Sequence, residues 1–430
     1  MSADERLPAI VMGRGPTALG ILRSLRMAGI PAYVACPPDD LVTHSRHYRP
    51  TPGALPWDGS PGPRALEILA AMPLARAVII AGADDAAMWL ADLPHGFLGE
   101  RFLVSTATRD AQELLQDKST FAGYLAAARV PHPRTFRLAE ATDIDAIPFD
   151  TLGRMFLKPV NSQKFSDVTG VKGVWVESRA ALREAWARFH DQGFRVMAQE
   201  YVPGPASEHF FIDGFRDGRG AYPGVFARRR LRMSPPDFGN SSCCHSVPLA
   251  IVPEALRHVR RVLDGLDYRG IFSAEFKRDP RDGEYRLIEV NTRAWTYVEF
   301  AARSGVNVCE MAWQDAQGLP VTRAARDYRD GVACVDLYHD LATVRSLPAA
   351  KHPGWIRLLL AWARADLHVF LRDDPVPALR FVQSVLRRRF GAHSARPSGA
   401  ATSSRDRRSA AIPSSDAAPA PTSISDAPSA

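Results

Sequence analysis

The sequence predicts a chain that starts as an α/β domain with a parallel sheet and continues as an α+β region. Near the N-terminus, short apolar strands alternate with helical segments, which is typical of a parallel sheet covered by helices on both faces. From about residue 114 the strands are longer, and Asp282-Gly283 separates two of them as a hairpin turn. Residues 393–430 consist mainly of Ser, Ala, Pro and Asp, so we expect a disordered tail there.

Length and composition limit the class of protein. The 430 residues are enough for two or three packed units, and 46% hydrophobic with 23% charged residues is ordinary for a soluble globular protein. The net charge of +7 suits a polyanionic small molecule and does not indicate nucleic acid. We see no signal peptide and expect no transmembrane segment, because charges interrupt the most apolar stretch. Five cysteines without metal-like spacing indicate reduced thiols and a cytoplasmic protein.

The first domain contains an incomplete dinucleotide-binding pattern. Its strands are expected at residues 8–12, 31–35, 75–81 and 101–105, with a helix to about residue 27 after the first. Glycines 13, 15 and 20 give GxGxxxxG rather than GxGxxG, and no acidic residue directly ends the second strand. We therefore interpret the glycines as a structural turn. Asp84 and Asp85 follow the third strand, where they form either a helix N-cap, which we favour, or part of a ligand site.

Two acidic residues on a hairpin are the strongest functional signal. Alternation along the strands places Glu275 with Lys277 on one face, and Glu289 with Asn291 on one face. If the strands pair around the Asp282-Gly283 turn, Glu275, Glu289 and Asn291 converge as oxygen ligands of the kind that Mg²⁺ prefers. Arg293 follows and can bind a phosphoryl group through its planar fork. The alternative is an exposed strand whose charges face water.

Lysines and a polar loop add to this signal. Lys158 ends an apolar strand, where a lysine has few structural reasons to lie, and Lys118 is a second candidate for phosphate binding. The loop 161–173 is polar, contains Lys172, and is a candidate lid over phosphates. Residues 199–204 form a strand that stops at a Pro-Gly turn, an edge whose backbone groups can bind adenine.

These motifs, in their order along the chain, resemble the ATP-grasp superfamily over about residues 8–320. The strings that carry the resemblance are FLKP at 156–159, QEYVPG at 199–204, AEFK at 274–277 and IEVNTR at 288–293. Three further strings, at 44–48, 230–239 and 304–307, resemble the D-aspartate ligase-like carboxylate–amine ligases within it. The loop 161–173 departs from the pattern, because it lacks a compact glycine run.

The resemblance implies a division of the chain. The N-terminal part would be a Rossmann-like pre-ATP-grasp domain, followed by the two subdomains of an ATP-grasp fold, a mixed and helical C-terminal segment and the disordered tail. The implied boundaries are 1–112 for the first domain, 113–195 and 196–327 for the two subdomains, 328–391 for the helical segment and 392–430 for the tail.

The resemblance also implies roles for individual residues. ATP phosphates would be bound by Lys118, Lys158 and Lys172, and adenine by the hinge Glu200, Tyr201 and Val202. Glu275, Glu289 and Asn291 would hold Mg²⁺, for which Mn²⁺ is an alternative, and Arg293 would stabilise the transferred phosphoryl group. On the acceptor side, alternation places Arg228, Arg230 and Arg232 on one strand face; we prefer Arg232 as the catalytic member, with a solvated strand face as the alternative.

The implied activity is that of an ATP-dependent carboxylate–amine ligase that works through an acyl phosphate. Its partners would be a small carboxylate and an amine, without nucleic acid, and any oligomer would be expected to be a homodimer. The alternatives are another ATP-grasp phosphoryl-transfer enzyme, such as a carboxylate kinase or carboxylase-like subunit, and a non-catalytic nucleotide-binding regulator. A basic helix end at residues 387–389 either rests on an anionic membrane surface or, as we favour, packs on the protein.

Overall fold

The computed structural model describes residues 6–160, 173–235, 239–325, 327–348 and 352–384. The chain divides into two units, Met1–Ser384 and Val385–Ala430, and every described residue lies in the first. The proposed lid except Gly173, the basic helix end 387–389 and the predicted disordered tail lie outside the described residues, and so does Lys172.

The N-terminal sheet is parallel, as the alternation of strands and helices predicts. Its strand order is β2-β1-β3-β4, and all three pairs are parallel. Alternate residues of β1 enter two different cores, one shared with α1 and the other with α2 and α3, so helices cover both faces. The elements are β1 (Ala9–Met12), α1 (Gly15–Met27), β2 (Ala32–Ala35), α2 (Pro63–Ala71), β3 (Ala77–Ala81), α3 (Asp84–Leu90) and β4 (Phe102–Leu103).

The glycine turn after β1 is satisfied within the protein. Gly15 has a positive φ of 62°, and its N–H donates to both carboxylate oxygens of Asp40 at 2.9 Å. Gly13 packs so closely on Gly82 that a Cβ there would lie 3.1 Å from the Gly82 Cα. A carboxylate of the protein therefore occupies the amide that a phosphate would need, which supports the structural interpretation of these glycines.

A small antiparallel sheet follows, with the strand order β5-β8-β6-β7. Alternate side chains of β6 and β8 pack with α8 in a separate apolar core. The strands are β5 (Thr135–Leu138), β6 (Met155–Pro159), β7 (Val174–Val176) and β8 (Val196–Glu200), and the helix is α8 (Arg179–Asp191).

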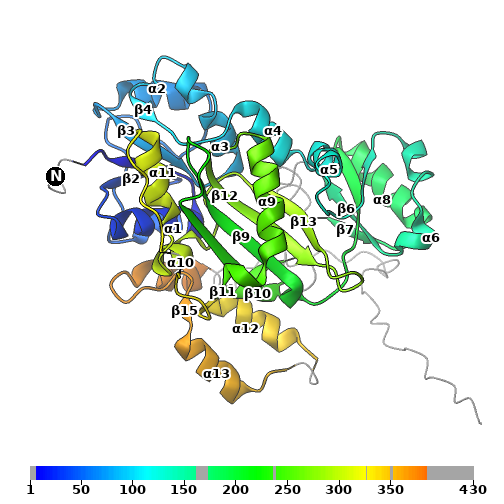
Figure 1. The fold of residues 1–430 in the computed structure, drawn as a ribbon. Coiled ribbons are helices and arrows are strands. Elements are labelled where there is room, and N and C mark those ends of the chain that lie inside the picture. Colours follow the sequence, from blue (N-terminus) through cyan, green and yellow to red (C-terminus); the bar gives the residue numbers. More distant parts are fainter. Residues whose placement is uncertain (1–5, 161–172, 236–238, 326, 349–351, 385–430) are drawn as a thin grey trace, which may run out of the picture. The chain divides into compact units, whose positions relative to one another are not determined.

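The largest sheet has the order β13-β12-β9-β10-β11-β14-β15, and its last pair alone is parallel. Helix α9 (Pro253–Gly265) lies across one face of this sheet, where it shares an apolar core with α4 (Arg109–Gln116) and α5 (Lys118–Ala127) (Figure 1). The strands are β9 (His209–Arg216), β10 (Gly224–Ser234), β11 (Asn240–Val247), β12 (Gly270–Arg278), β13 (Tyr285–Asn291), β14 (Ala333–Val335) and β15 (Asp366–Leu367).

The C-terminal segment completes this sheet rather than standing beside it. Strands β14 and β15 extend it at one edge, so the predicted boundary at 327/328 falls between strands of one sheet. Helix α12 (Leu337–Ser346) packs on β10 and β11, and α13 (Trp355–Arg364) follows. The short helices α10 (Val298–Arg303) and α11 (Val308–Ala316) contact α1. In the described part of the chain, no helix is long and apolar enough to cross a membrane.

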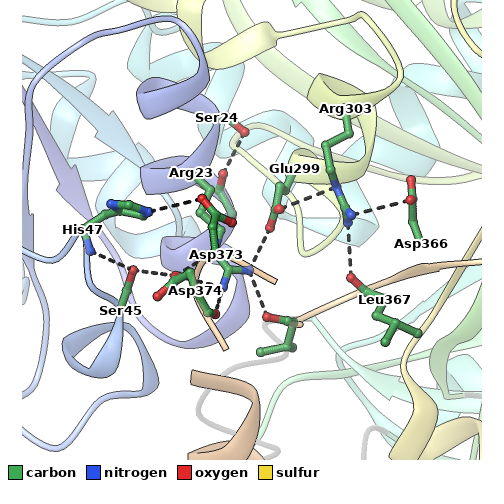
Figure 2. A network of polar contacts seen from close by, with 12 residues as sticks. Arg23, Ser24, Ser45, His47, Glu299, Arg303, Asp366, Leu367, Asp373 and Asp374 are labelled. Atoms are coloured by element: carbon green, nitrogen blue, oxygen red, sulfur yellow. Dashed lines mark hydrogen bonds and ion pairs between the residues drawn. The ribbon is translucent and has the colours of Figure 1, made fainter. Parts of the chain in front are cut away.

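A buried ionic network ties the C-terminal segment to the first domain (Figure 2). Arg23 on α1 donates through Nε and NH2 to Asp374 and through NH1 to Glu299 of α10. Ser45 donates to the same Asp374 carboxylate at 2.7 Å. These contacts join residues that are 276 to 351 positions apart in the sequence, so they hold tertiary structure rather than any single element.

Candidate functional site

The two carboxylates of the predicted metal site lie directly opposite each other. In the β12–β13 pair, Glu275 is in register with Glu289, and Ser273 with Asn291. The Asn291 amide donates to Glu289 Oε1 at 3.4 Å, so the third predicted ligand joins the pair. The predicted hairpin and its convergence of oxygens are therefore present in the structure. Only 14% of the Glu275 side chain is exposed, so the alternative of an exposed strand is wrong for this residue.

This donor set fits a magnesium ion. Mg²⁺ takes one or two carboxylates and completes its shell with water and substrate phosphates. The described residues contain no group of three or more His, Cys, Asp or Glu that could hold a metal ion. A magnesium ion at this position would need further oxygens from water or from a bound phosphate.

Cationic side chains surround the carboxylates. Lys118 Nζ, at the start of α5, lies 3.6 Å from Glu289 Oε2. Arg230 NH1 on β10 lies 3.1 Å from Glu275 Oε1, and His209 Nδ1 on β9 lies 2.7 Å from the same oxygen. Burial by itself would raise the pKa of Glu275, but Arg230 and His209 outweigh burial and hold that pKa well below its usual range.

Lys158 faces this group from the small sheet. Its Nζ donates to Gln199 Oε1 at 2.7 Å. Burial and the charge of Lys118 lower the pKa of Lys158 to about 8, while Glu289 and Glu275 act in the opposite direction. Lys158 is therefore close enough to Lys118, Glu289 and Glu275 for their charges to affect its pKa.

The predicted adenine hinge connects the two sheets. Glu200 ends β8, and its side chain accepts from the backbone N–H of Arg134 at 3.1 Å and from Arg281 at 2.7 Å. The ring of Tyr201 contacts Trp175 edge-on and lies under the Lys277 ammonium at 4.7 Å, and Val202 is buried. The side chains of Glu200 and Tyr201 are thus engaged by other parts of the protein.

Arg293 is held by the first domain. Its Nε and NH2 donate to the two carboxylate oxygens of Asp84 at 2.7 and 3.2 Å, and NH2 lies 3.5 Å from Asn291 Oδ1. The N-cap interpretation of Asp84 is wrong, because the cap residue of α3 is Ala83 and Asp84 lies in the first turn. The carboxyl end of β3 thus contributes to the wall of the site, as open α/β sheets commonly do.

The three arginines of β10 separate into different environments. Arg228 donates to the fully buried Asp213 at 2.7 Å and stacks on Phe211. Arg230 stacks on the same ring and reaches Glu275. Arg232, our preferred member, makes a bidentate pair with buried Asp340 at 2.7 Å for each bond.

The separation has a local cause. The pairing of β10 with β11 shifts register between Arg230 and Arg232, which is a bulge that redirects the strand. Arg228 and Arg230 are buried, so the interpretation as a solvated strand face is wrong for them. The structure brings Arg230, and not Arg232, next to the carboxylates.

Sequence reasoning missed His209. The residue lies on β9 with Phe211 and Asp213 on the same face, an alternation that is visible in the sequence. A single histidine among apolar residues gives no sign of its partner in the sequence. Cys243 and Cys244 on β11 are both free and buried.

Comparison with known proteins extends this description. No protein-family model matches the chain. The chain is 24% identical over 234 residues to the D-aspartate ligase of Enterococcus faecium, which covers 51% of this chain and 53% of that protein. It is 25% identical over 194 residues to the arginine-specific large chain of carbamoyl phosphate synthase from Halalkalibacterium halodurans, covering 44% of this chain and 17% of that one. The chain thus spans about half the length of the first relative and less of the second.

Solved structures share the fold. A biotin carboxylase from Campylobacter jejuni, solved as an ATP-analogue complex, superimposes with a TM-score of 0.58 at 17% identity, covering 77% of this chain and 75% of that one. A carboxyaminoimidazole ribonucleotide synthase from Aspergillus clavatus, solved with ATP, gives 0.55 at 15% identity, covering 75% and 80%. These matches confirm that the chain resembles the ATP-grasp superfamily and, within it, the D-aspartate ligase-like enzymes.

Proposed function

We propose that this protein, which resembles the ATP-grasp enzymes in fold and in its motifs, is an ATP-dependent carboxylate–amine ligase. The observation that carries the proposal is the register pair Glu275–Glu289 with Asn291 beside it, faced by Lys118 and Lys158 from other elements. Oxygen ligands for a divalent cation and ammonium groups for phosphates lie in one site, as phosphoryl transfer from a nucleotide requires.

Each group has a task in nucleotide binding. Glu275, Glu289 and Asn291 would hold Mg²⁺, which when bound neutralises charge on phosphate oxygens. Lys118 and Lys158 would bind the phosphates directly, with Lys172 as a further candidate outside the described residues. The backbone of the hinge, residues 200–202, would bind adenine, since its side chains are already engaged.

The chemistry proceeds in two steps. A substrate carboxylate oxygen attacks the γ-phosphorus of ATP, the bond to the bridging oxygen breaks, and ADP leaves with an acyl phosphate formed. An amine then attacks the acyl carbon, phosphate departs with the bonding electron pair, and the nitrogen loses a proton. The protein mainly positions the reactants and stabilises negative charge on the phosphoryl oxygens.

The arginines divide this task according to their partners. Arg230 is a cation at the carboxylate pair, and we assign it to the transferred phosphoryl group and the substrate carboxylate. Arg293 bridges Asp84 and Asn291, so we assign it to positioning Asn291 and, through exchange of its Asp84 partner, to the phosphoryl group. We assign Arg232 an indirect role, because Asp340 already binds both ends of its guanidinium group.

Phosphate release with a trapping agent tests the proposal. The protein is incubated with MgATP and pools of amino acids and small carboxylates, with and without hydroxylamine, which converts acyl phosphates to hydroxamates. We expect a hydroxamate whose mass identifies the acid. Formation of ADP with one acyl phosphate per ADP, which accumulates without an amine and without phosphate release, would instead indicate a carboxylate kinase. Nucleotide binding without turnover over the full pool would indicate a regulator.

A further inference from the structure

Helix α13 presents an apolar stripe on its outward side. Ile356, Leu359, Leu360 and Ala363 are spaced i, i+3, i+4 and i+7, which places them on one face of a helix, and all four are exposed. Ile356 is 78% exposed, a high value for a large aliphatic side chain. The helix therefore turns the stripe away from the protein, the reverse of ordinary amphipathic packing.

The opposite side of α13 is what fixes it. Leu358 is buried, and Trp362 Nε1 donates to Asp340 Oδ2 at 2.8 Å. Asp340, on α12, also binds both ends of the Arg232 fork. Figure 1 shows α13 beyond α12. Since these contacts define the rotation of the helix, the outward direction of the stripe follows from them.

Cations border the stripe. Arg357 and Arg364 are seven residues apart, so they lie on the same edge of the helix, and both are exposed. The sequence of α13 contains no acidic residue. An exposed apolar stripe with a basic edge is the pattern of a helix that lies in a lipid–water interface, where arginine stems extend toward headgroups.

We propose that α13 docks the protein on an anionic lipid surface, with the stripe entering the interface and Arg357 and Arg364 contacting headgroups. This inference concerns a surface and does not depend on the proposed catalytic function. The helix lies on the surface and does not span the bilayer.

Other occupants fit these observations less well. A second copy of α13 would bring its basic edge into an interface that holds no acidic residue from either helix. Residues 385–430 of this chain contain five large apolar residues, Val385, Leu386, Phe390, Ile412 and Ile424. The first three flank the basic run 387–389, which would bring further cations to the basic edge of α13. A partner protein would have to supply both an apolar groove for the convex helix and acidic groups for its basic edge, whereas an anionic bilayer supplies an apolar interior and anionic headgroups together.

Co-sedimentation with vesicles tests the proposal on the full chain. The vesicles contain either phosphatidylcholine alone or a 60:40 mixture of phosphatidylcholine and phosphatidylglycerol. We expect binding to the mixed vesicles, at least tenfold weaker binding for the double variant I356E/L360E, and about fivefold weaker binding for R357Q or R364Q. Phe97→Glu is the matched control, because Phe97 is 79% exposed on the first domain, and we expect it to bind as the unmodified chain does.

Two further measurements separate the alternatives. Light scattering gives the mass in solution, and a dimer that I356E/L360E dissociates, without vesicle binding, would overturn the proposal in favour of a second copy. A melting temperature lowered in I356E/L360E as far as in a core variant would show that the chain itself covers the stripe, which would also overturn it. Binding to mixed vesicles that the double variant retains would place the docking surface elsewhere.

Discussion

The carboxylates of β12 and β13 and the ionic network of Figure 2 are both built from acidic and basic side chains, yet they differ in how far their charges are satisfied. In the network, Arg23 and Asp374 are at most 2% exposed, and each is held by several bonds of about 3 Å. In the site, Glu289 is 34% exposed, and its cation Lys118 lies 3.6 Å away. The Arg23–Asp374 pair at the centre of the network is closed to solvent, whereas Glu289 in the site is partly open.

The difference shows how structural and ligand-binding charges can be told apart. Removal of one partner from a buried ion pair strongly destabilises a protein, because the other partner is left as an uncompensated buried charge. A partly exposed carboxylate with a long contact costs little when its partner is exchanged, so a metal or phosphate can replace that partner. Variants in the network should therefore change stability, and variants in the site should change turnover.

The largest effect on turnover is expected for Glu289→Gln. Loss of a carboxylate ligand should lower MgATP turnover about 1,000-fold, which corresponds to about 4 kcal/mol, while the melting temperature changes by less than about 2 °C. Phosphate release and thermal unfolding measure the two quantities. Glu67→Gln, in an exposed pair with Arg64, is the matched control. Turnover near that of the unmodified protein would contradict the metal assignment.

Arg23→Met should produce the opposite result. It leaves Asp374 buried without the cation that holds it and leaves Glu299 with Arg303 alone, which we expect to lower the free energy of unfolding by about 3–5 kcal/mol. Urea unfolding measures this, with Arg64→Met as an exposed control. Turnover per folded molecule should stay within about twofold. A loss of less than about 1 kcal/mol would show that the network does not stabilise the contact between the C-terminal segment and the first domain.

The pH dependence of nucleotide binding sharpens the comparison further. The pKa of Lys158 is lowered to about 8, so its ammonium is present below pH 8 and is lost in the free protein above it. Affinity for a non-hydrolysable ATP analogue should be constant from pH 6.5 to 7.5 and fall up to about tenfold per unit above pH 8. Calorimetric titration at several pH values would show this fall.

Lys158→Arg serves as the control, because a guanidinium stays charged over this range. Its affinity for the analogue should be nearly independent of pH. If the unmodified protein binds the ATP analogue equally well at pH 7 and pH 9.5, Lys158 does not contact the phosphates as an ammonium.

The smallest effect is expected where the first domain touches the site. Asp84→Asn keeps the shape but weakens the pairing with Arg293, so we expect kcat to fall about three- to tenfold with a smaller change in KM for ATP. Asp85→Asn is a matched control from the same helical turn, where the side chain accepts from the backbone N–H of its neighbour Ala86. Equal effects of the two substitutions would show that the Asp84–Arg293 contact has no role in positioning.

Local patterns in the sequence predicted the elements and the candidate metal ligands. Alternation along residues 274–277 and 288–291, together with the Asp282-Gly283 turn, predicted a hairpin that carries Glu275 and Glu289 on adjacent strands. The register that places them opposite each other includes a shift between Glu275 and Phe276, which the sequence did not predict. Alternating apolar strands and helices likewise predicted the parallel first sheet. The order of the motifs supplied the resemblance that the comparisons confirm.

Only the tertiary structure decided which charges meet. A bulge in β10, which no residue pattern announces, sends Arg230 toward Glu275 and Arg232 toward Asp340. The Arg293–Asp84 contact spans 209 residues and the Arg23–Asp374 contact 351. Sequence periodicity reports which face of its own element a side chain occupies. The partner of a charge depends instead on the packing of whole elements against one another, and that packing is fixed by the complete fold.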